Sequence, residues 1–318
     1  MVSRRFWTRL RDAVQTDGRA VLVVLVQSQG HAPNGPGAKM VVTAQTRFGT
    51  VGGGSSEHDL AQKAQALLDD IPFAPEVVTL EHVDEMGDRD GRVCGGVQRF
   101  VLVGLDRKDL EVLGQLSDAD ENRTSVTLVI SPQGLAIDSA DGAVESEWQE
   151  VSGDWRYAET VGTGPLLSII GGGHVALALS QVMANLDFEV RVFDNRPNLD
   201  TMDQNIWAHR KAIIDYSRVR EHIPEGPSSH VCIMTYAHAH DQDVLERLID
   251  LDLAYLGLMG SPRKIRLMRE NLLEKGIPAE QLNRVRMPIG LDIGSQTPQE
   301  IAVSIAAQLI KLRRTGQP

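Results

Sequence analysis

A glycine-rich turn near the middle of the chain has the spacing of a phosphate-binding loop. Residues 171–176 read GGGHVA, which fits G-x-G-x-x-A, and they lie between an apolar run and a predicted helix. Glycines let the backbone approach a diphosphate closely, and a helix N-terminus supplies unpaired N–H groups with partial positive charge. Asp194 ends the next predicted strand, 23 residues after Gly171, near the ~20 expected for an acid that binds ribose hydroxyls.

These residues favour an anionic, nucleotide-like ligand at the turn. Arg196, two residues after the acid, could bind a phosphate in place of a ribose hydroxyl. The alternative is a turn whose glycines only let the helix pack on its strand. The predicted ligand-binding residues of this region are Gly171, Gly172, Gly173, His174, Asp194 and Arg196.

A second glycine turn lies in the first half of the chain, before a helix predicted from Glu57 to Leu68. Ser56 and Asp59, three residues apart, resemble a capping box that opens this helix. The turn is either a second phosphate-binding loop or a plain tight turn. In the first case its binding residues are Gly52, Gly53, Gly54 and Glu57.

The two cysteines of the chain stand in different surroundings. Cys94 and Gly95 lie in a glycine-containing loop, and Arg89 and Arg92 are close enough in sequence to lower the pKa of the thiol from its usual ~8.5. Cys94 is therefore a candidate thiolate ligand or nucleophile, the alternative being a small buried side chain. Cys232 lies inside an apolar strand, where a core role is predicted.

Polar groups also follow a predicted strand of the second half, at the edge where parallel sheets bind ligands. We expect His238 to hydrogen-bond a ligand and Asp241 to cap the next helix. His238 and His240 could hold a metal, but no cysteine or acidic set with zinc spacing accompanies them. We therefore expect no metal site.

The next strand is followed by Ser261 and then by two cations, Arg263 and Lys264, at a helix start. Cations there oppose the helix dipole, which favours an anion bound to Lys264. The alternative is a solvated basic face that continues along the helix. Asp292, in a glycine loop nearer the C-terminus, is predicted to face the same crevice.

The elements that position these groups fall into two halves, so the predicted fold class is α/β. Residues 1–138 mix strands with two helices and predict an α+β domain. Residues 139–164 form a polar boundary, either a linker or a surface hairpin. In residues 165–318, strands and helices alternate, which predicts a Rossmann-like parallel sheet. The predicted strands are 20–27, 38–44, 77–83, 97–105, 125–130, 166–170, 189–193, 231–235 and 254–259, and the predicted helices are 3–15, 57–68, 174–185, 241–249, 263–275 and 297–313.

The composition excludes several classes of protein. Of 318 residues, 42% are hydrophobic and 24% charged, as in ordinary globular proteins. A net charge of −11 speaks against nucleic-acid binding. The longest apolar run, 20–26, is far shorter than the ~20 residues of a membrane helix, and no signal peptide is expected. Two cysteines fit a reducing cytoplasm.

Taken together, these segments resemble the XdhC/CoxI family of xanthine dehydrogenase accessory proteins. In the family pattern T-H-x-H-x-x-D, His238 and Asp241 match, whereas Tyr236 replaces the first histidine; Ser55 stands where the family has Ala or Cys. The matching segments are GHAPNGPGAKMVV (30–42), GTVGGGSSEHDL (49–60), CGG (94–96), IIGGGHVALAL (169–179), FDNRP (193–197), LGLMGSPRKI (256–265) and MPIGLDIGSQTPQEIAVSI (287–305).

The resemblance implies an N-terminal XdhC-type domain, a C-terminal Rossmann domain and a homodimer. It also implies a chaperone that binds the molybdenum cofactor in its molybdopterin form. Such a chaperone holds the cofactor while a cysteine desulfurase supplies the sulfido ligand, then delivers it to an apo molybdenum hydroxylase. Two alternatives remain open: an NAD(P)-dependent oxidoreductase that uses the Rossmann fingerprint, and a partner-recruiting module with no functional pocket.

Overall fold

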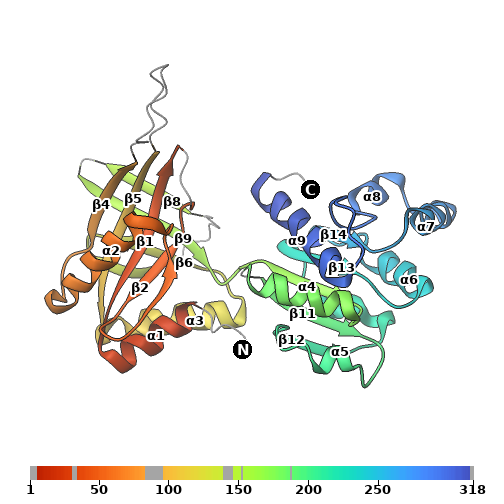
Figure 1. Cartoon of the computed structure of the whole chain (residues 1–318), viewed down its shortest axis with the longest axis horizontal. Helices are drawn as coiled ribbons and strands as arrows, with labels where there is room; N and C mark the ends of the chain where they lie inside the picture. The colour runs from red at the N-terminus through yellow and green to blue at the C-terminus, as the bar shows by residue number, and fades with distance from the viewer. Residues whose placement is uncertain are drawn as a thin grey trace, which may run out of the picture. The chain divides into compact units, whose positions relative to one another are not determined.

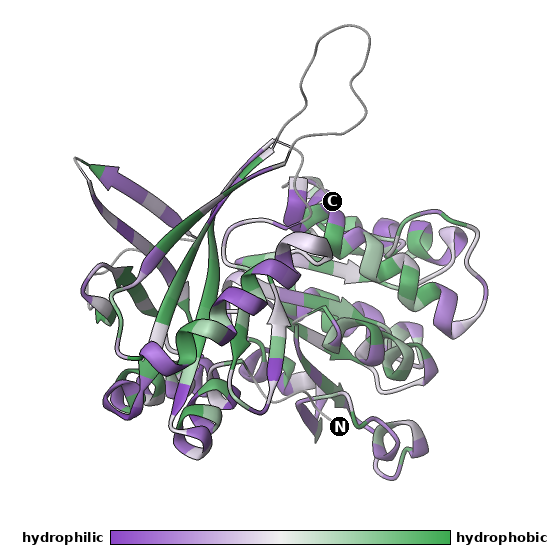
Figure 2. Ribbon diagram, turned by 60° about the vertical axis from the view of Figure 1, so that its left-hand side comes forward, coloured by the Kyte–Doolittle hydropathy of each residue, from purple (hydrophilic) through white to green (hydrophobic). Residues whose placement is uncertain are grey.

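The computed structural model describes residues 6–30, 34–82, 96–138, 146–151, 153–186 and 188–315. The chain forms two compact units, Arg4–Thr163 and Gly164–Pro318 (Figure 1). Strands at the centre of each unit are dominated by hydrophobic residues, whereas the helices carry hydrophilic stripes (Figure 2). No helix within the described ranges is long and apolar enough to cross a membrane.

The first unit contains two antiparallel sheets. One has the order β3-β2-β1-β5-β4 and the other the order β7-β6-β9-β8. The strands are β1 (Arg19–Gln29), β2 (Lys39–Val42), β3 (Arg47–Thr50), β4 (Glu76–His82), β5 (Gly96–Asp106), β6 (Val126–Ser131), β7 (Gly134–Asp138), β8 (Glu147–Val151) and β9 (Asp154–Val161). The helices are α1 (Phe6–Asp17), α2 (Gly54–Leu67) with the 3₁₀ turn Leu68–Asp70, and α3 (Leu110–Asn122) after the 3₁₀ turn Arg107–Asp109.

Strand β1 holds this unit together because it is apolar on both faces. Leu22 and Val24 belong to a core shared with the second sheet, α1 and α3. Val21 and Val23 point the other way, into a core covered by α2. Within the expected boundary segment, β8 and β9 pair with each other and β9 also pairs with β6, so residues 147–161 are part of the first unit.

Helix α3 is not one of the two helices expected in this half. It buries Leu113, Leu116, Ser117 and Ala119, so only two of its buried positions are strongly apolar. A stripe this weak carries little helical signal, and burial against α1 and the second sheet supplies the stability.

The second unit is a parallel five-stranded sheet with helices on both faces. Its strand order is β12-β11-β10-β13-β14, the order 3-2-1-4-5 of a Rossmann fold, which confirms the predicted class. The strands are β10 (Leu166–Ile170), β11 (Glu189–Asp194), β12 (Arg210–Ile213), β13 (Gly226–Ile233) and β14 (Leu253–Leu258). The helices are α4 (His174–Ala184), α5 (Asp200–Asp203), the 3₁₀ helix η3 (Tyr216–His222), α6 (His238–Leu248), α7 (Pro262–Glu274), α8 (Ala279–Arg284) and α9 (Pro298–Thr315).

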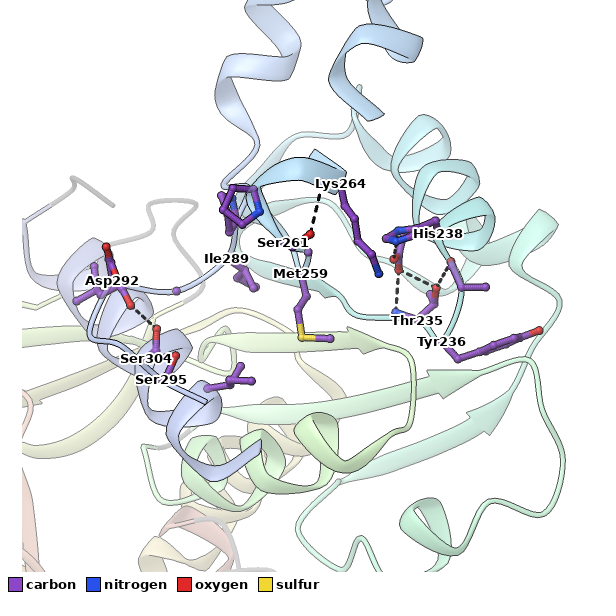
Figure 3. A pocket seen from close by; sticks show the side chains of 18 residues that line it. Thr235, Tyr236, His238, Met259, Ser261, Lys264, Ile289, Asp292, Ser295 and Ser304 are labelled. Atoms are coloured by element: carbon purple, nitrogen blue, oxygen red, sulfur yellow. Dashed lines mark hydrogen bonds and ion pairs between the residues drawn. The ribbon is translucent and has the colours of Figure 1, made fainter. Parts of the chain in front are cut away.

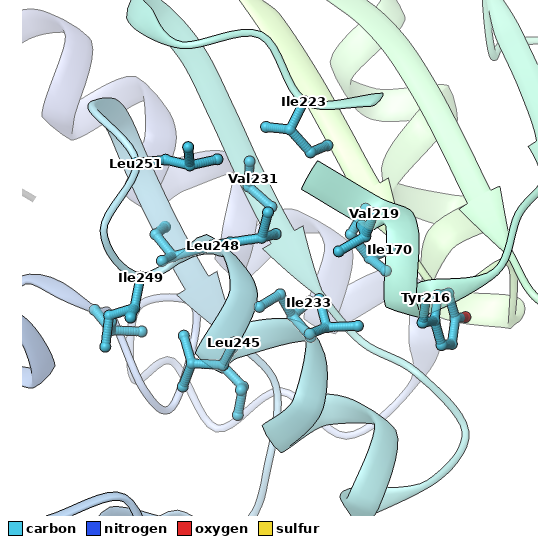
Figure 4. Packing of buried hydrophobic residues seen from close by; sticks show 14 of the residues in the cluster. Ile170, Tyr216, Val219, Ile223, Val231, Ile233, Leu245, Leu248, Ile249 and Leu251 are labelled. Atoms are coloured by element: carbon cyan, nitrogen blue, oxygen red, sulfur yellow. The ribbon is translucent and has the colours of Figure 1, made fainter. Parts of the chain in front are cut away.

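The helices divide between two cores. One core joins the sheet to η3, α6, α7 and α8, and Figure 4 shows Ile170, Val231 and Ile233 from the strands meeting Leu245 and Leu248 from α6. The other core joins the sheet to α4, α5 and α9 and contains the fully buried Cys232. The core role predicted for Cys232 is thereby confirmed.

Candidate functional site

A pocket of about 890 Å³ lies at the carboxyl ends of β13 and β14. Its walls come from the loops that follow these two strands, from the segment 288–295 and from α9 (Figure 3). This is the sheet edge where parallel α/β proteins bind ligands. His238, Asp241, Ser261, Lys264 and Asp292, all predicted from the sequence, line it together.

Lys264 is the cation of this pocket. Ser261 is the N-cap of α7, where its Oγ accepts a hydrogen bond from the Lys264 amide at 3.4 Å, and Pro262 occupies the first turn. The Lys264 side chain extends toward Thr235 and His238 (Figure 3). Among the described residues no carboxylate lies within ion-pair distance of its ammonium group. A cation that faces a pocket without such a partner is suited to bind an anionic group.

Asp241 has a different role from the predicted one. Its Oδ1 accepts hydrogen bonds from the Thr235 amide at 2.9 Å and the Thr235 hydroxyl at 2.7 Å. The prediction that Asp241 caps the following helix is wrong, because α6 begins at His238 and the carboxylate turns back to the end of β13. Burial raises the pKa of Asp241 against the opposing effects of Thr235, His238 and Lys264.

His238 lies in the first turn of α6 and not in a loop. Its Nδ1 is 3.8 Å from Asp241 Oδ2, and its side chain is 46% exposed, so the ring is open to the pocket. No group of three or more His, Cys, Asp or Glu side chains suited to a metal occurs in the part of the chain that the structure describes.

The wall of the pocket that contains Asp292 is hydrogen-bonded to α9. The Gly290 amide donates to Gln308 Oε1 at 3.0 Å, Gln308 Nε2 donates to Gly290 O at 3.3 Å, and Ser304 Oγ donates to Leu291 O at 2.6 Å. Gly290 has a φ of +94°, and a Cβ there would lie 2.3 Å from Ser304 Oγ. Ser304 and Gln308 are not among the residues predicted from the sequence, although two polar residues four positions apart lie on one face of a helix and could have pointed to them.

The glycine turn after β10 adjoins the pocket. Gly171 has a φ of +113°, and a Cβ on it would lie 2.3 Å from Met234 O, so it packs on the backbone that continues into Thr235. A Cβ on Gly172 would lie 2.6 Å from Met202 Sδ. Both glycines are therefore required by packing within the unit.

Gly173 is different. Its backbone is extended, with φ −77° and ψ −168°, and a Cβ would meet nothing within 4 Å. His174, the first residue of α4, is exposed. No contact with the described residues explains a glycine at this position, so Gly173 is the residue of the turn that leaves room for a ligand.

Asp194 holds this turn. Its Oδ2 accepts from the Gly172 amide at 2.7 Å, and its two oxygens accept the Arg196 guanidinium through Nε and Nη2, each at 2.9 Å. The residue is 0% exposed, so it offers no free oxygen to a ribose in this structure. Burial alone would raise the pKa of Asp194, but the hydrogen bonds from Arg196 and Gly172 lower it overall.

The glycine turn of the first unit is filled by its own chain. Glu57 Oε2 accepts hydrogen bonds from the Val51 amide at 2.9 Å, the Gly53 amide at 3.0 Å and the Thr50 hydroxyl. Partial burial alone would raise the pKa of Glu57, but these bonds lower it. Glu57 thus takes the position that a ligand anion would occupy if the turn were a phosphate-binding loop.

The expected capping box of this helix is wrong. Helix α2 begins at Gly54, with Gly53 as its N-cap and no side-chain cap, so Ser56 and Asp59 lie inside the helix. Three successive glycines at positive φ, Gly52, Gly53 and Gly54, allow the chain to enter the helix earlier than the polar pattern suggests.

One end of the five-stranded sheet is where β1, β3 and β4 end and where β5 begins. Gln29, the last residue of β1, pairs with Val97, and His82, the last of β4, pairs with Gly96. Thr50 ends β3 beside Lys39, toward the same end. Cys94 and Gly95 lie outside the described residues.

Two family models match the chain. The model described as the XdhC Rossmann domain matches residues 167–309, and the model described as the XdhC and CoxI family matches residues 13–77. They correspond to the second unit and to part of the first.

Several relatives are similar to the chain. A Bacillus subtilis (strain 168) protein named as a probable xanthine dehydrogenase subunit is 24% identical over 97% of this chain and 98% of its own length. The molybdenum cofactor insertion chaperone PaoD of Escherichia coli (strain K12) is 25% identical over 95% of this chain and 86% of its own. The uncharacterized protein YqeB of Escherichia coli (strain K12) is 32% identical over 49% of this chain. The matched part covers only 28% of the length of YqeB.

A crystal structure described as a xanthine dehydrogenase from Bacillus halodurans shares the fold. It has a TM-score of 0.77 and 25% identity over 97% of this chain and 96% of that one. Together with the matches to both units, this shows that the chain belongs to the XdhC and CoxI family.

Proposed function

We propose that this protein is a chaperone that binds the molybdenum cofactor and inserts it into an apo enzyme of the xanthine dehydrogenase type. The family supports this role, as do the relatives named as a cofactor insertion chaperone and as a xanthine dehydrogenase subunit. The observation that carries the proposal is the pocket at the ends of β13 and β14, into which the cation Lys264 faces.

The pocket offers complementary groups to such a cargo. Molybdopterin carries a phosphate and a polar heterocycle. In this proposal Lys264 and the open face of Gly173 bind the phosphate, while His238, Ser261 and Asp292 hydrogen-bond the ring system. A phosphate bound to a lysine and to backbone amides is held by charge-assisted hydrogen bonds, which are stronger than neutral ones.

The remaining parts of the proposal concern partners. A cysteine desulfurase supplies the terminal sulfido ligand while the cofactor is bound, and an apo molybdenum hydroxylase receives the product. The chaperone acts as a homodimer in the cytoplasm, and Cys94 approaches the metal or its sulfur.

The charge of Lys264 provides the first test. Lys264→Glu is expected to weaken binding of purified molybdopterin cofactor about tenfold, since a phosphate loses its cation and meets a carboxylate. The loss should be larger at low salt than at high salt, because screening shortens the reach of an exposed charge. Titration under reducing, anaerobic conditions at two salt concentrations measures both effects.

Arg266→Glu is the matched control, since Arg266 is an exposed cation on the same helix that does not line the pocket. If both charge reversals weaken binding equally, α7 contributes only a general basic face.

The open space at Gly173 provides a second test. Gly173→Val is expected to leave the fold intact, because its extended backbone accepts a β-branched residue. The new side chain occupies the approach to the first turn of α4, and cofactor affinity should fall about tenfold. Thermal unfolding and cofactor titration of the same sample separate the two effects. A folded variant with parental affinity would make the turn purely structural.

The role of Cys94 provides a third test. Cys94→Ser is expected to preserve stability and to lose most of the activation of an apo molybdenum hydroxylase, because a hydroxyl ionises far less readily than a thiol and is a poorer soft ligand. Activation per mole of folded chaperone is the measurement.

Cys232→Ser is the control for this experiment. Cys232 is 0% exposed, and burial raises the pKa of its thiol. A hydroxyl buried there is expected to cost about 1–3 kcal/mol of stability without changing activation per folded molecule. Parental activation by Cys94→Ser would show the assignment of the thiol to be wrong.

A further inference from the structure

The fingerprint of a dinucleotide-binding fold is present in the second unit, yet its crevice is bridged by two side chains. Asp194 ends β11 and Arg196 follows it, while Tyr236 follows β13. The Arg196 guanidinium lies over the Tyr236 ring, 4.3 Å from its centroid. Strand β10 lies between β11 and β13, so this contact passes over the end of β10, where the glycine turn begins.

Both ends of this Arg196–Tyr236 bridge are anchored. On one side, Arg196 is held by two hydrogen bonds to the Asp194 carboxylate, each at 2.9 Å. On the other side, the Tyr236 hydroxyl is 2.9 Å from His240 Nε2 on α6, and the His240 ring packs edge-on against the buried Tyr216. Tyr236 lines one end of the pocket, and Figure 3 shows its ring pointing away from Asp292 and Met259.

A dinucleotide needs the space and the groups that this bridge uses. In a Rossmann site the pyrophosphate lies at the helix after the first strand, and the acid at the end of the second strand binds the adenosine ribose. Here that acid is Asp194, which is 0% exposed with both oxygens hydrogen-bonded inside the chain. The first turn of α4 stays open at Gly173, so a phosphate can still reach it.

We infer that Arg196 and Tyr236 determine ligand specificity by closing the adenosine side of the crevice, so that the unit excludes NAD(P)-type dinucleotides. The first turn of α4 and the pocket at the ends of β13 and β14 stay accessible to a smaller, phosphate-bearing ligand. This inference does not depend on the identity of the cargo. It means that this chain has a Rossmann fold but does not act as a dinucleotide-dependent oxidoreductase.

The test uses ADP-ribose and NADH as probes, with three variants of the full chain. Tyr236→Ala removes the ring and Arg196→Ala frees the acid, whereas Tyr236→Phe keeps the ring over which Arg196 lies. Both alanine variants are expected to bind ADP-ribose at least about tenfold more tightly than the parent, because the binding-competent state becomes more populated. Tyr236→Phe keeps the ring but loses the hydrogen bond to His240, so it is expected to gain clearly less affinity than Tyr236→Ala.

Calorimetric titration measures the affinities, and thermal unfolding confirms that each variant is folded. Tyr236 is 55% exposed, so Tyr236→Ala is expected to fold. If Arg196→Ala proves unstable, the Tyr236→Ala variant alone still tests the inference. Two results overturn the inference: a parent that binds ADP-ribose as tightly as the alanine variants, or a phenylalanine variant that gains as much affinity as the alanine variant. Titration of the parent with molybdopterin cofactor is a separate measurement. Absence of binding there would overturn the proposed function and leave this inference standing.

Discussion

Gly171→Ala is expected to destabilise the second unit by roughly 3–5 kcal/mol. Two costs combine in this figure. The backbone φ of +113° is one that L-residues rarely adopt, and the added Cβ would lie 2.3 Å from the carbonyl oxygen of Met234. That oxygen belongs to the chain leaving β13, the neighbour of the central strand β10. This segment cannot move without disturbing the hydrogen bond between the Met234 amide and Ile170 O.

The measurement is thermal and chemical unfolding, with an expected fall in the melting temperature of the unit by about 10 °C. Gly173→Ala is the matched control two residues away. It has an extended backbone and open space, so its effect on stability should stay within about 0.5 kcal/mol. Equal stability of the two variants would contradict the close packing of the turn on β13.

Lys39→Met is expected to destabilise the first unit by about 3–5 kcal/mol, because it leaves a buried carboxylate without its cation. Lys39 Nζ lies 2.7 Å from Glu159 Oε1, and the two side chains are only 13% and 6% exposed. Lys39 also donates to Gly37 O at 2.8 Å, and the Tyr157 hydroxyl donates to Glu159 Oε2 at 2.8 Å. Burial and the Glu159 charge raise the pKa of Tyr157, so the phenol remains a donor.

Two comparisons make this prediction specific. Lys39→Met combined with Glu159→Gln should recover most of the loss, because the amide still accepts from Tyr157 and no charge stays buried. Lys63→Met breaks the pair with Glu76, whose side chains are 39% and 43% exposed, and should cost less than about 1 kcal/mol. The prediction would be wrong if Lys39→Met and Lys63→Met had the same denaturation midpoint shift.

The architecture of the second unit could be predicted because its signals are local. Alternating apolar strands and helices predict a parallel sheet, and the strand predicted at 166–170 coincides with β10. Helix α9 begins as predicted, since Glu300 Oε2 accepts from the Thr297 amide at 2.9 Å and Thr297 Oγ1 accepts from the Glu300 amide at 3.3 Å. A capping box involves residues only three positions apart, so it can be recognised from the sequence alone.

The partners of the charged site residues could not be predicted in the same way. Spacing placed Asp194 at the end of a strand, but it did not show that Arg196 would fold back onto the carboxylate. It likewise left open whether the turn at Gly53 binds a phosphate, without showing that Glu57 supplies the anion. In both cases a glycine turn that can bind a ligand anion binds a carboxylate of its own chain, because an internal group loses no translational entropy on binding.

The hydrogen bonds between the 288–295 segment and α9 affect how the pocket recognises its ligand. Because Gly290 and Leu291 are hydrogen-bonded to Gln308 and Ser304, this wall of the pocket is ordered before any ligand binds. Binding then has little loop-ordering entropy to overcome, and more of the interaction energy appears as affinity. Such a preorganised wall also fixes the ligand's shape in advance, so it selects among candidate molecules instead of adapting to each.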